Sequence, residues 1–205
     1  MNNDLQIIGL TGGIATGKST CARTLQELLP ETVLFDADAS VRSLYENNAV
    51  LDEIGSYFGS GALLPGGGVD KAFLRERAFS NPEDKEFLEQ VFHPRVREEC
   101  LALLLQTSRK GVSRLFVADV PLLFENGFDF GQSANLLVAT SRKTQVDRLI
   151  ERNKWDDGTV QAVLSSQMPI EAKHGLADVV IWNEGPVDIL RSQCRRFIQS
   201  RNISI

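Results

Sequence analysis

Residues 12–19 (Gly-Gly-Ile-Ala-Thr-Gly-Lys-Ser) fit the pattern GxxxxGK[ST] in full, between a short apolar run and a helix-like pattern. A phosphate-binding loop requires this context, because backbone N–H groups of the loop and of the helix start converge on the β-phosphate of a nucleotide. Lys18 is expected to reach the β- and γ-phosphates, and the Ser19 hydroxyl to ligate Mg²⁺. Thr20 either bonds the α-phosphate or caps the helix. The residues predicted to contact the nucleotide here are Gly12, Gly13, Ala15, Thr16, Gly17, Lys18, Ser19 and Thr20.

Carboxylates follow two of the apolar runs that look like strands. Asp36 and Asp38 follow one run, and Asp119 ends another. Ligands collect outside the carboxyl ends of strands in open α/β sheets, so either group could hold Mg²⁺ through water or orient an attacking hydroxyl. Asp36 or Asp38 could instead cap the helix that is predicted at 39–45. We expect one of them to be the cap and at least one to be catalytic.

A basic segment with Arg148 and Arg152 follows the fourth apolar run. The two arginines are four residues apart and share one face of a predicted helix. On a mobile segment, such side chains can clamp the γ-phosphate of a nucleotide and stabilise the charge of the transition state. The alternative is a solvated helix with local ion pairs, since Asp147 and Glu151 are close by in the sequence.

Two short patterns also occur in GTPases. Residues 153–156 spell NKxD and residues 52–55 spell DxxG. The first follows the arginine-containing helix instead of a strand, and the second lies in an amphipathic helix pattern. Their context argues against guanine recognition, and a nucleotide-dependent switch stays a minor alternative.

Five short apolar runs must position these groups. Near-continuous hydrophobicity predicts buried strands of a parallel sheet that is covered on both faces. The predicted strands are 5–10, 32–36, 114–119, 135–140 and 178–182. The predicted helices are 19–29, 39–45, 49–58, 71–79, 83–107 and a last one after Gly185-Pro186. The fold class is therefore α/β, a P-loop NTPase-type parallel five-stranded sheet flanked by helices.

The gap between the second and third predicted strands is long and rich in helical patterns, with a glycine-rich loop at 59–68. It predicts a helical substrate-binding insertion at about 39–111. The core of the single domain is expected at about 1–38, 112–140 and 176–205, and a lid at about 141–175.

Composition limits the classes of function. The 205 residues are 42% hydrophobic and 24% charged, with a net charge of −5. These values are typical of a soluble globular protein and argue against a general nucleic-acid binder. The apolar run 5–10 is too short to span a membrane and lacks the flanks of a signal peptide, so we expect a cytoplasmic protein without a membrane partner. Cys21, Cys100 and Cys194 are expected to be buried structural thiols.

Several segments taken together resemble dephospho-coenzyme A kinases. The similar segments, which run in family order over nearly the whole chain, are 10–20, Asp36-Ala37-Asp38 with Arg42, His93-Pro94, 121–125 (Pro-Leu-Leu-Phe-Glu), Arg148 with Arg152, and Ala177-Asp178 leading to Asn183. The P-loop is generic to many kinases, whereas the other segments in combination are specific. One departure is Ala15, which stands where relatives can carry glycine.

The resemblance implies transfer of the ATP γ-phosphate to the ribose 3′-hydroxyl of dephospho-coenzyme A, the last step of coenzyme A synthesis. It implies catalytic roles for Asp38, Lys18 and Arg148, with Asp38 as the base or orienting carboxylate. Residues implied to bind the acceptor are Thr11, Asp38, Arg42, His93, Pro121, Leu122, Leu123 and Glu125. Residues implied to bind ATP beyond the P-loop are Arg148, Arg152 and Asn183.

Simpler roles compete with these. His93 could be the N-cap at a helix break, Leu122 and Leu123 could serve packing alone, and Asn183 could be a turn residue. Another small-molecule P-loop kinase is the second hypothesis for function. The sequence does not decide the oligomeric state.

Overall fold

The computed structural model describes residues 5–203 of the chain. Residues 1–4 and 204–205, which fall in the predicted core, lie outside the described residues. The chain forms two compact units, Met1–Phe35 with Leu103–Ile205, and Asp36–Ala102.

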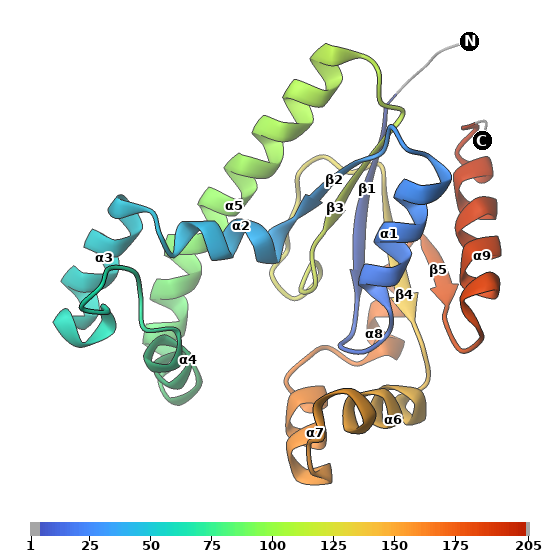
Figure 1. Cartoon of the computed structure of the whole chain (residues 1–205). Coiled ribbons are helices and arrows are strands. Elements are labelled where there is room, and N and C mark those ends of the chain that lie inside the picture. The colour runs from blue at the N-terminus through green and yellow to red at the C-terminus, as the bar shows by residue number, and fades with distance from the viewer. Residues whose placement is uncertain (1–4, 204–205) are drawn as a thin grey trace. The chain divides into compact units, whose positions relative to one another are not determined.

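The larger unit is built on a five-stranded sheet with the order β2-β3-β1-β4-β5 (Figure 1). The strands are β1 Gln6–Gly12, β2 Val33–Asp36, β3 Leu115–Asp119, β4 Ala134–Ala139 and β5 Val179–Trp182. β1 pairs in parallel with β3 and β4, and Leu10 lies opposite both Asp119 and Leu136. The predicted parallel sheet is confirmed, and the carboxyl ends of β1 and β3 meet at one edge.

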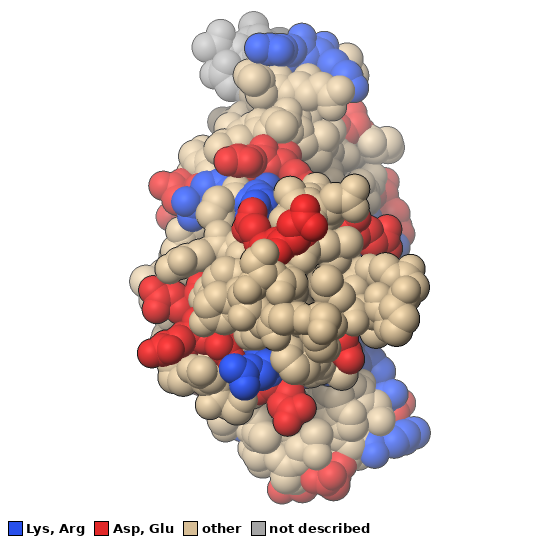
Figure 2. Space-filling view, turned by 90° about the vertical axis from the view of Figure 1, so that its left-hand side faces the viewer, with Lys and Arg blue, Asp and Glu red and all other residues tan. Residues whose placement is uncertain are grey.

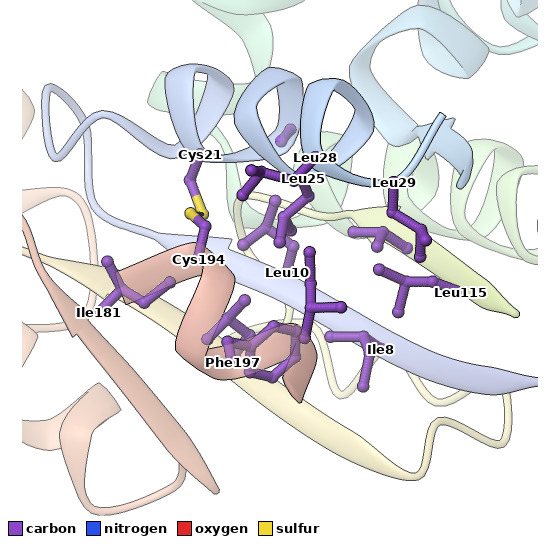
Figure 3. Packing of buried hydrophobic residues seen from close by; sticks show 14 of the residues in the cluster. Ile8, Leu10, Cys21, Leu25, Leu28, Leu29, Leu115, Ile181, Cys194 and Phe197 are labelled. Carbon is purple, nitrogen blue, oxygen red and sulfur yellow. Dashed lines mark hydrogen bonds between the residues drawn. The ribbon is translucent and has the colours of Figure 1, made fainter. Parts of the chain in front are cut away.

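Helices of the larger unit follow the strands. They are α1 Lys18–Leu28, α6 Arg142–Asn153, α7 Asp157–Ser165, α8 Ile170–His174 and α9 Val187–Ser200. The α1 and α9 helices pack together and bury their apolar stripes with the sheet residues Ile8 and Leu10 (Figure 3). Cys21 and Cys194 face each other in this core, with their sulfur atoms 3.6 Å apart. The expectation of buried thiols is confirmed, because all three cysteines are buried and free.

The smaller unit is helical. Its elements are α2 Ala37–Leu44, α3 Asn48–Phe58, the 3₁₀ turn η1 Ser60–Ala62, α4 Lys71–Ser80 and the first part of α5 Pro82–Lys110. Asp36, Asn47 and Asp70 cap α2, α3 and α4 by accepting backbone N–H bonds, as expected for these residue types. The rings of Tyr57 and Phe87 stack with centroids 3.8 Å apart and join α3 to α5.

The α5 helix runs through Pro94 without a break. A helix break after His93, one of the two alternatives for that residue, is therefore wrong. Proline removes one backbone donor and strains the preceding turn. In this turn the Val91 carbonyl accepts a bond of 2.6 Å from the Arg95 side chain.

Figure 2 shows one face of the molecule, on which Asp and Glu side chains are spread among uncharged residues and Lys and Arg occur in small separate groups. Among residues 5–203, no helix combines the length and apolar content needed to cross a membrane.

Candidate active site

The P-loop connects β1 to α1, and the start of α1 has no side-chain cap. The first intrahelical bond of α1 runs from the Cys21 N–H to the Gly17 carbonyl (3.0 Å), and no side chain caps the helix start. The N–H groups of Lys18, Ser19 and Thr20 precede this bond and have no carbonyl one turn back. Uncapped N–H groups at the positive end of a helix dipole favour an anion such as a phosphate.

Glycine is required at two positions of this loop. A Cβ at Gly12 would lie 2.6 Å from the Val138 carbonyl oxygen. Gly17 has φ +93°, and a Cβ there would lie 2.2 Å from the Asn183 amide nitrogen. Ala15 also has a positive φ (62°), a conformation that is costly for a residue with a side chain. The loop is thus held in a strained shape around the space where phosphate groups would bind.

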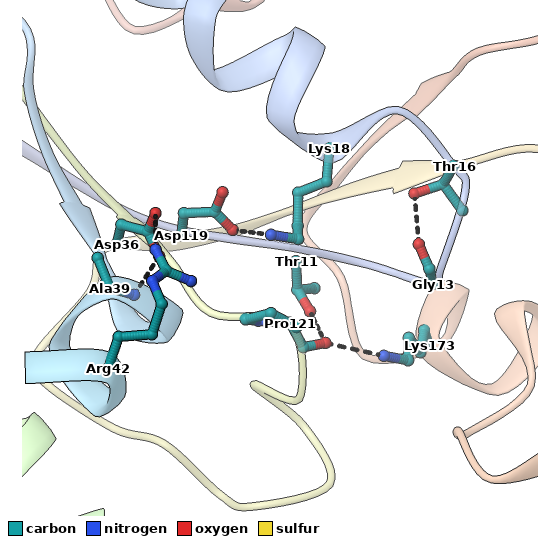
Figure 4. A network of polar contacts seen from close by, with 10 residues as sticks. All are labelled: Thr11, Gly13, Thr16, Lys18, Asp36, Ala39, Arg42, Asp119, Pro121 and Lys173. Atoms are coloured by element: carbon teal, nitrogen blue, oxygen red, sulfur yellow. Dashed lines mark hydrogen bonds and ion pairs between the residues drawn. The ribbon is translucent and has the colours of Figure 1, made fainter. Parts of the chain in front are cut away.

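Lys18, the first residue of α1, forms an ion pair with Asp119 of β3, the strand beside β1 (Figure 4). Asp119 is buried at the carboxyl end of β3. The Ser19 side chain is exposed at the start of α1. Mg²⁺ prefers oxygen ligands and keeps water and phosphate ligands beside one or two carboxylates. No group of three His, Cys, Asp or Glu side chains among the described residues could hold a metal by itself. The hydroxyl and carboxylate therefore suit Mg²⁺ that arrives with a nucleotide.

Arg148 and Arg152 differ in their surroundings although they share a helix face. The Arg148 guanidinium donates to the carbonyls of Ala15 (3.0 Å) and Asn183 (2.9 Å), so it lies against the P-loop. Arg152 is exposed, and its Nε donates to the Asn153 side chain at 2.7 Å. Only Arg148 is thus brought to the P-loop in this conformation.

Asn183 lies directly behind the P-loop. It is buried, and its side-chain nitrogen donates to the Thr16 carbonyl at 2.8 Å. The Thr16 hydroxyl is also used inside the loop, since it donates to the Gly13 carbonyl at 2.9 Å. Contact between Asn183 and the adenine of ATP stays a prediction. Next to it, Glu184 accepts bonds from Thr144 and the Ser141 backbone, and these bonds lower its pKa to about 2.

The segment after β3 forms a buried polar cluster with α8. The Pro121 carbonyl accepts bonds from the Thr11 hydroxyl (3.0 Å) and from the Lys173 ammonium (3.2 Å; Figure 4). Lys173 is fully buried and pairs with Glu125 at 2.8 Å. Thr11 is fully buried as well. The hydroxyl of Thr11 and one oxygen of Glu125, both predicted to bind an acceptor, thus serve internal contacts in this conformation.

The two leucines of this segment differ in burial. Leu123 is buried, and a Cβ on Gly9 would lie 3.0 Å from its side chain, so it packs directly on β1. Leu122 and the Pro121 ring are half-buried. Packing accounts for Leu123, whereas Leu122 keeps surface that a ligand could reach.

In the smaller unit, the structure separates the roles of the two acidic residues near α2. Asp36 is the cap, with its Oδ1 accepting the Ala39 N–H at 2.8 Å, and Asp36 also lies 3.6 Å from the Arg42 guanidinium (Figure 4). Asp38 is exposed in the first turn of α2 and is not the cap. The expectation that one carboxylate caps the helix is confirmed, and Asp38 has no part in the cap.

His93 is half-buried within α5, and this burial lowers its pKa. An imidazole with a lowered pKa is neutral at pH 7 and can accept as well as donate a hydrogen bond.

The residues of the NKxD pattern are used for helix ends. Lys154 ends α6 in a left-handed conformation with φ 57°, and Asp156 caps α7 by accepting the Thr159 N–H at 2.8 Å. These contacts explain the pattern without guanine recognition.

Three polar residues at the P-loop and β3 were not predicted as site residues. Gln145 and Gln167 bond the two sides of the Ile14 backbone, and Lys173 forms the ion pair described above. A weak signal exists for Gln145, which precedes the buried Leu149 by one helical turn and so falls on an apolar face. No local pattern identifies the other two, because their partners are distant in the sequence.

Comparison with known proteins gives a consistent result. A sequence profile of the dephospho-CoA kinase family matches residues 6–188. A dephospho-CoA kinase of Fusobacterium nucleatum is 35% identical over 196 residues, which are 96% of this chain and 98% of that protein. A crystal structure of a Thermus thermophilus protein matches with a TM-score of 0.80 and 31% identity, covering 96% of this chain and 98% of that one. A dephospho-CoA kinase structure from Campylobacter jejuni matches with a TM-score of 0.67 and 30% identity, covering 95% and 96%.

Proposed function

The chain belongs to the dephospho-CoA kinase family, and we propose that it transfers the γ-phosphate of ATP to the ribose 3′-hydroxyl of dephospho-coenzyme A, which yields coenzyme A and ADP. This reaction is the last step of coenzyme A synthesis. The observation that carries the proposal is the uncapped P-loop with Lys18 at the start of α1, in a chain that matches the family over residues 6–188.

The larger unit binds ATP. Backbone N–H groups at the start of α1 hold the β-phosphate, and Lys18 leaves Asp119 to bind the β- and γ-phosphates. Arg148 uses two of its five N–H donors for backbone carbonyls, so further donors remain for the γ-phosphate. Arg152 joins it when the segment 141–175 closes as a lid, and Asn183 lies beside the adenine.

Ser19 and Asp119 supply the oxygen atoms that would hold Mg²⁺, Asp119 through water. When bound to the nucleotide, Mg²⁺ neutralises charge on the phosphate oxygens. The residues of the P-loop align the phosphates, which is the main requirement of phosphoryl transfer.

The smaller unit binds the acceptor. Asp38 orients the 3′-hydroxyl and takes its proton as the oxygen attacks the γ-phosphorus; the bond from that phosphorus to the β-γ bridging oxygen breaks, and ADP leaves. The exposure of Asp38 supports this role, since Asp36 is already used as the cap. Arg42 and the neutral His93 offer hydrogen-bond donors to the acceptor. The protein acts on small soluble molecules, and we place it in the cytoplasm.

The first test is ADP release from ATP and Mg²⁺, with and without dephospho-coenzyme A, with mass analysis of the product. Acceptor-dependent ADP release and a product one phosphate heavier are expected. If ATP binds but the acceptor does not stimulate ADP release, the function is wrong, and the result favours another small-molecule P-loop kinase. Slow hydrolysis of GTP without any acceptor would favour a nucleotide switch.

Replacing the proposed base separates chemistry from binding. Asp38→Asn is expected to lower kcat by at least about a hundredfold, the usual contribution of a positioned acid or base. Its affinity for ATP, measured by calorimetry, should stay as in the wild type, because Asp38 belongs to the other compact unit. Loss of ATP binding together with turnover would reassign Asp38 to a structural or metal-binding role. Asp36→Asn, which keeps an N-capping side chain, is the matched control and should retain turnover.

A further inference from the structure

Two glutamine side chains bond opposite sides of one P-loop residue. The Ile14 N–H donates to Gln167 Oε1 at 2.9 Å, and Gln145 Nε2 donates to the Ile14 carbonyl at 2.7 Å. The backbone group of Ile14 determines which amide atom of each glutamine must face it. An N–H group requires an acceptor, so the oxygen of Gln167 faces it, and a carbonyl requires a donor, so the nitrogen of Gln145 faces it.

Both contacts are built into packed surroundings. Gln145 is buried in α6, and a Cβ on Gly13 would lie 2.8 Å from its Nε2, so the amide lies directly against the loop. Gln167 lies between α7 and α8, and the next residue, Met168, donates its N–H to Glu125 Oε1 at 3.2 Å. The buried Lys173 pairs with the same oxygen. Gln167 is therefore held in place by an anchored segment.

The contacts surround the strained part of the loop. Ala15, next to Ile14, has φ 62°, and its carbonyl accepts the bond from Arg148. A residue in a costly backbone conformation keeps it only where surrounding contacts determine it. Three side chains of the segment 141–175 thus hold two consecutive residues of the loop.

We propose that Gln145 and Gln167 are positioning residues for phosphoryl transfer, which fix the Ile14 peptide groups so that the P-loop keeps its phosphate-binding shape. This inference rests on the proposed function in one respect, that ATP binds at the P-loop. It adds that residues of the predicted lid shape the phosphate site from behind, through side chains that touch no reacting atom.

Substitutions of similar size test the acceptor role of Gln167 and the donor role of Gln145 separately. Gln167→Glu keeps an acceptor for the Ile14 N–H, whereas Gln167→Met removes it. Gln145→Glu and Gln145→Met both remove the donor, and the carboxylate also repels the Ile14 carbonyl. Gln193→Met is the control, because both amide atoms of Gln193 bond the Trp182 backbone on β5 (3.1 and 2.9 Å) rather than the P-loop.

ATP affinity is measured by calorimetry in the absence of the acceptor, and KM and kcat are measured for both substrates. Gln145→Met, Gln145→Glu and Gln167→Met are expected to weaken ATP binding by about three- to tenfold, the effect of one lost hydrogen bond. Gln167→Glu should bind ATP more tightly than Gln167→Met, while Gln145→Glu should bind no better than Gln145→Met. KM for the acceptor and all values of Gln193→Met should match the wild type.

Equal effects of Glu and Met at position 167, or unchanged ATP affinity in all four variants with only a lower melting temperature, would overturn the proposal and leave a purely structural role. Failure of the wild type to bind ATP would instead refute the proposed function. The two failures are therefore distinguishable.

Discussion

At the scale of single residues, Ala15 is the position of the phosphate-binding loop at which a side chain is held on a left-handed backbone. Its left-handed backbone costs energy that a glycine would not incur. The side chain offsets part of this energy, because Ala15 and Ile14 pack against the small core of Leu149, Val160 and Leu164. The alanine methyl is small enough to be tolerated on a left-handed backbone, and it still contacts this core.

Substitutions at position 15 should show this balance. Ala15→Gly is expected to leave the free energy of unfolding within about 1 kcal/mol of the wild type. Relief of about 1–2 kcal/mol of strain is offset by about 0.4–1 kcal/mol of chain entropy in the unfolded state and by the lost methyl contact. Ala15→Val should lower the free energy of unfolding by about 2 kcal/mol, because a β-branched residue is a poor fit for this conformation. Urea unfolding measures both, and equal stability of the two variants would contradict the assignment of strain.

At the scale of elements, the short helix α8 is attached by a fully buried charge. The five-residue α8 places Lys173, which has no exposed surface, against Glu125 and the Pro121 carbonyl. Such a short helix has little stability of its own. Its position against the segment 121–125 depends on this ion pair and its hydrogen bonds.

Removing one partner of the pair should cost more than removing both. Lys173→Met is expected to lower the free energy of unfolding by about 3 kcal/mol, the low end of the range for a broken buried pair, since the Glu125 side chain keeps 18% exposure. The double variant Lys173→Met with Glu125→Leu should recover part of this loss, because no buried charge is left unpaired. Urea unfolding of both variants and of Glu125→Leu completes the cycle. An additive double variant would show that the two charges do not interact.

At the scale of the whole molecule, the two compact units correspond in the proposed function to two ligands. Residues of the P-loop and its supporting side chains all lie in the larger unit, whereas Asp38, Arg42 and His93 lie in the smaller one. A ligand that binds the folded state reduces local opening of the region that it contacts.

Each ligand should therefore slow hydrogen exchange in the compact unit that binds it. A non-hydrolysable ATP analogue is expected to slow exchange at residues 12–20 and in the segment 141–175. Dephospho-coenzyme A alone should slow exchange mainly within 36–102. Mass spectrometry of peptides from each unit provides the measurement. Protection of 36–102 by the ATP analogue, without effect of the acceptor there, would contradict the assignment of the smaller unit to the acceptor.

Local sequence patterns determined the elements of this protein. Near-continuous apolar runs predicted all five strands, and amphipathic periodicity predicted most helices. The strand, the glycine pattern and the helix start together predicted the position of the P-loop. These features depend on contacts between residues a few positions apart, so the spacing of residue types along the sequence is enough to predict them. At Pro94 two local signals disagreed: the helical pattern predicted a helix over 83–107, whereas proline favours a break, and the structure follows the helical pattern.

Tertiary structure decided which polar groups meet. It assigned the cap to Asp36 rather than Asp38, paired Lys18 with Asp119, and placed Gln167 on Ile14, 153 positions away in the chain. The sequence pattern around a polar residue of a helix is the same whether its side chain faces water or bonds a distant backbone group. Its partner depends on the order of strands in the sheet and on the path of the segments between them, which no local pattern contains.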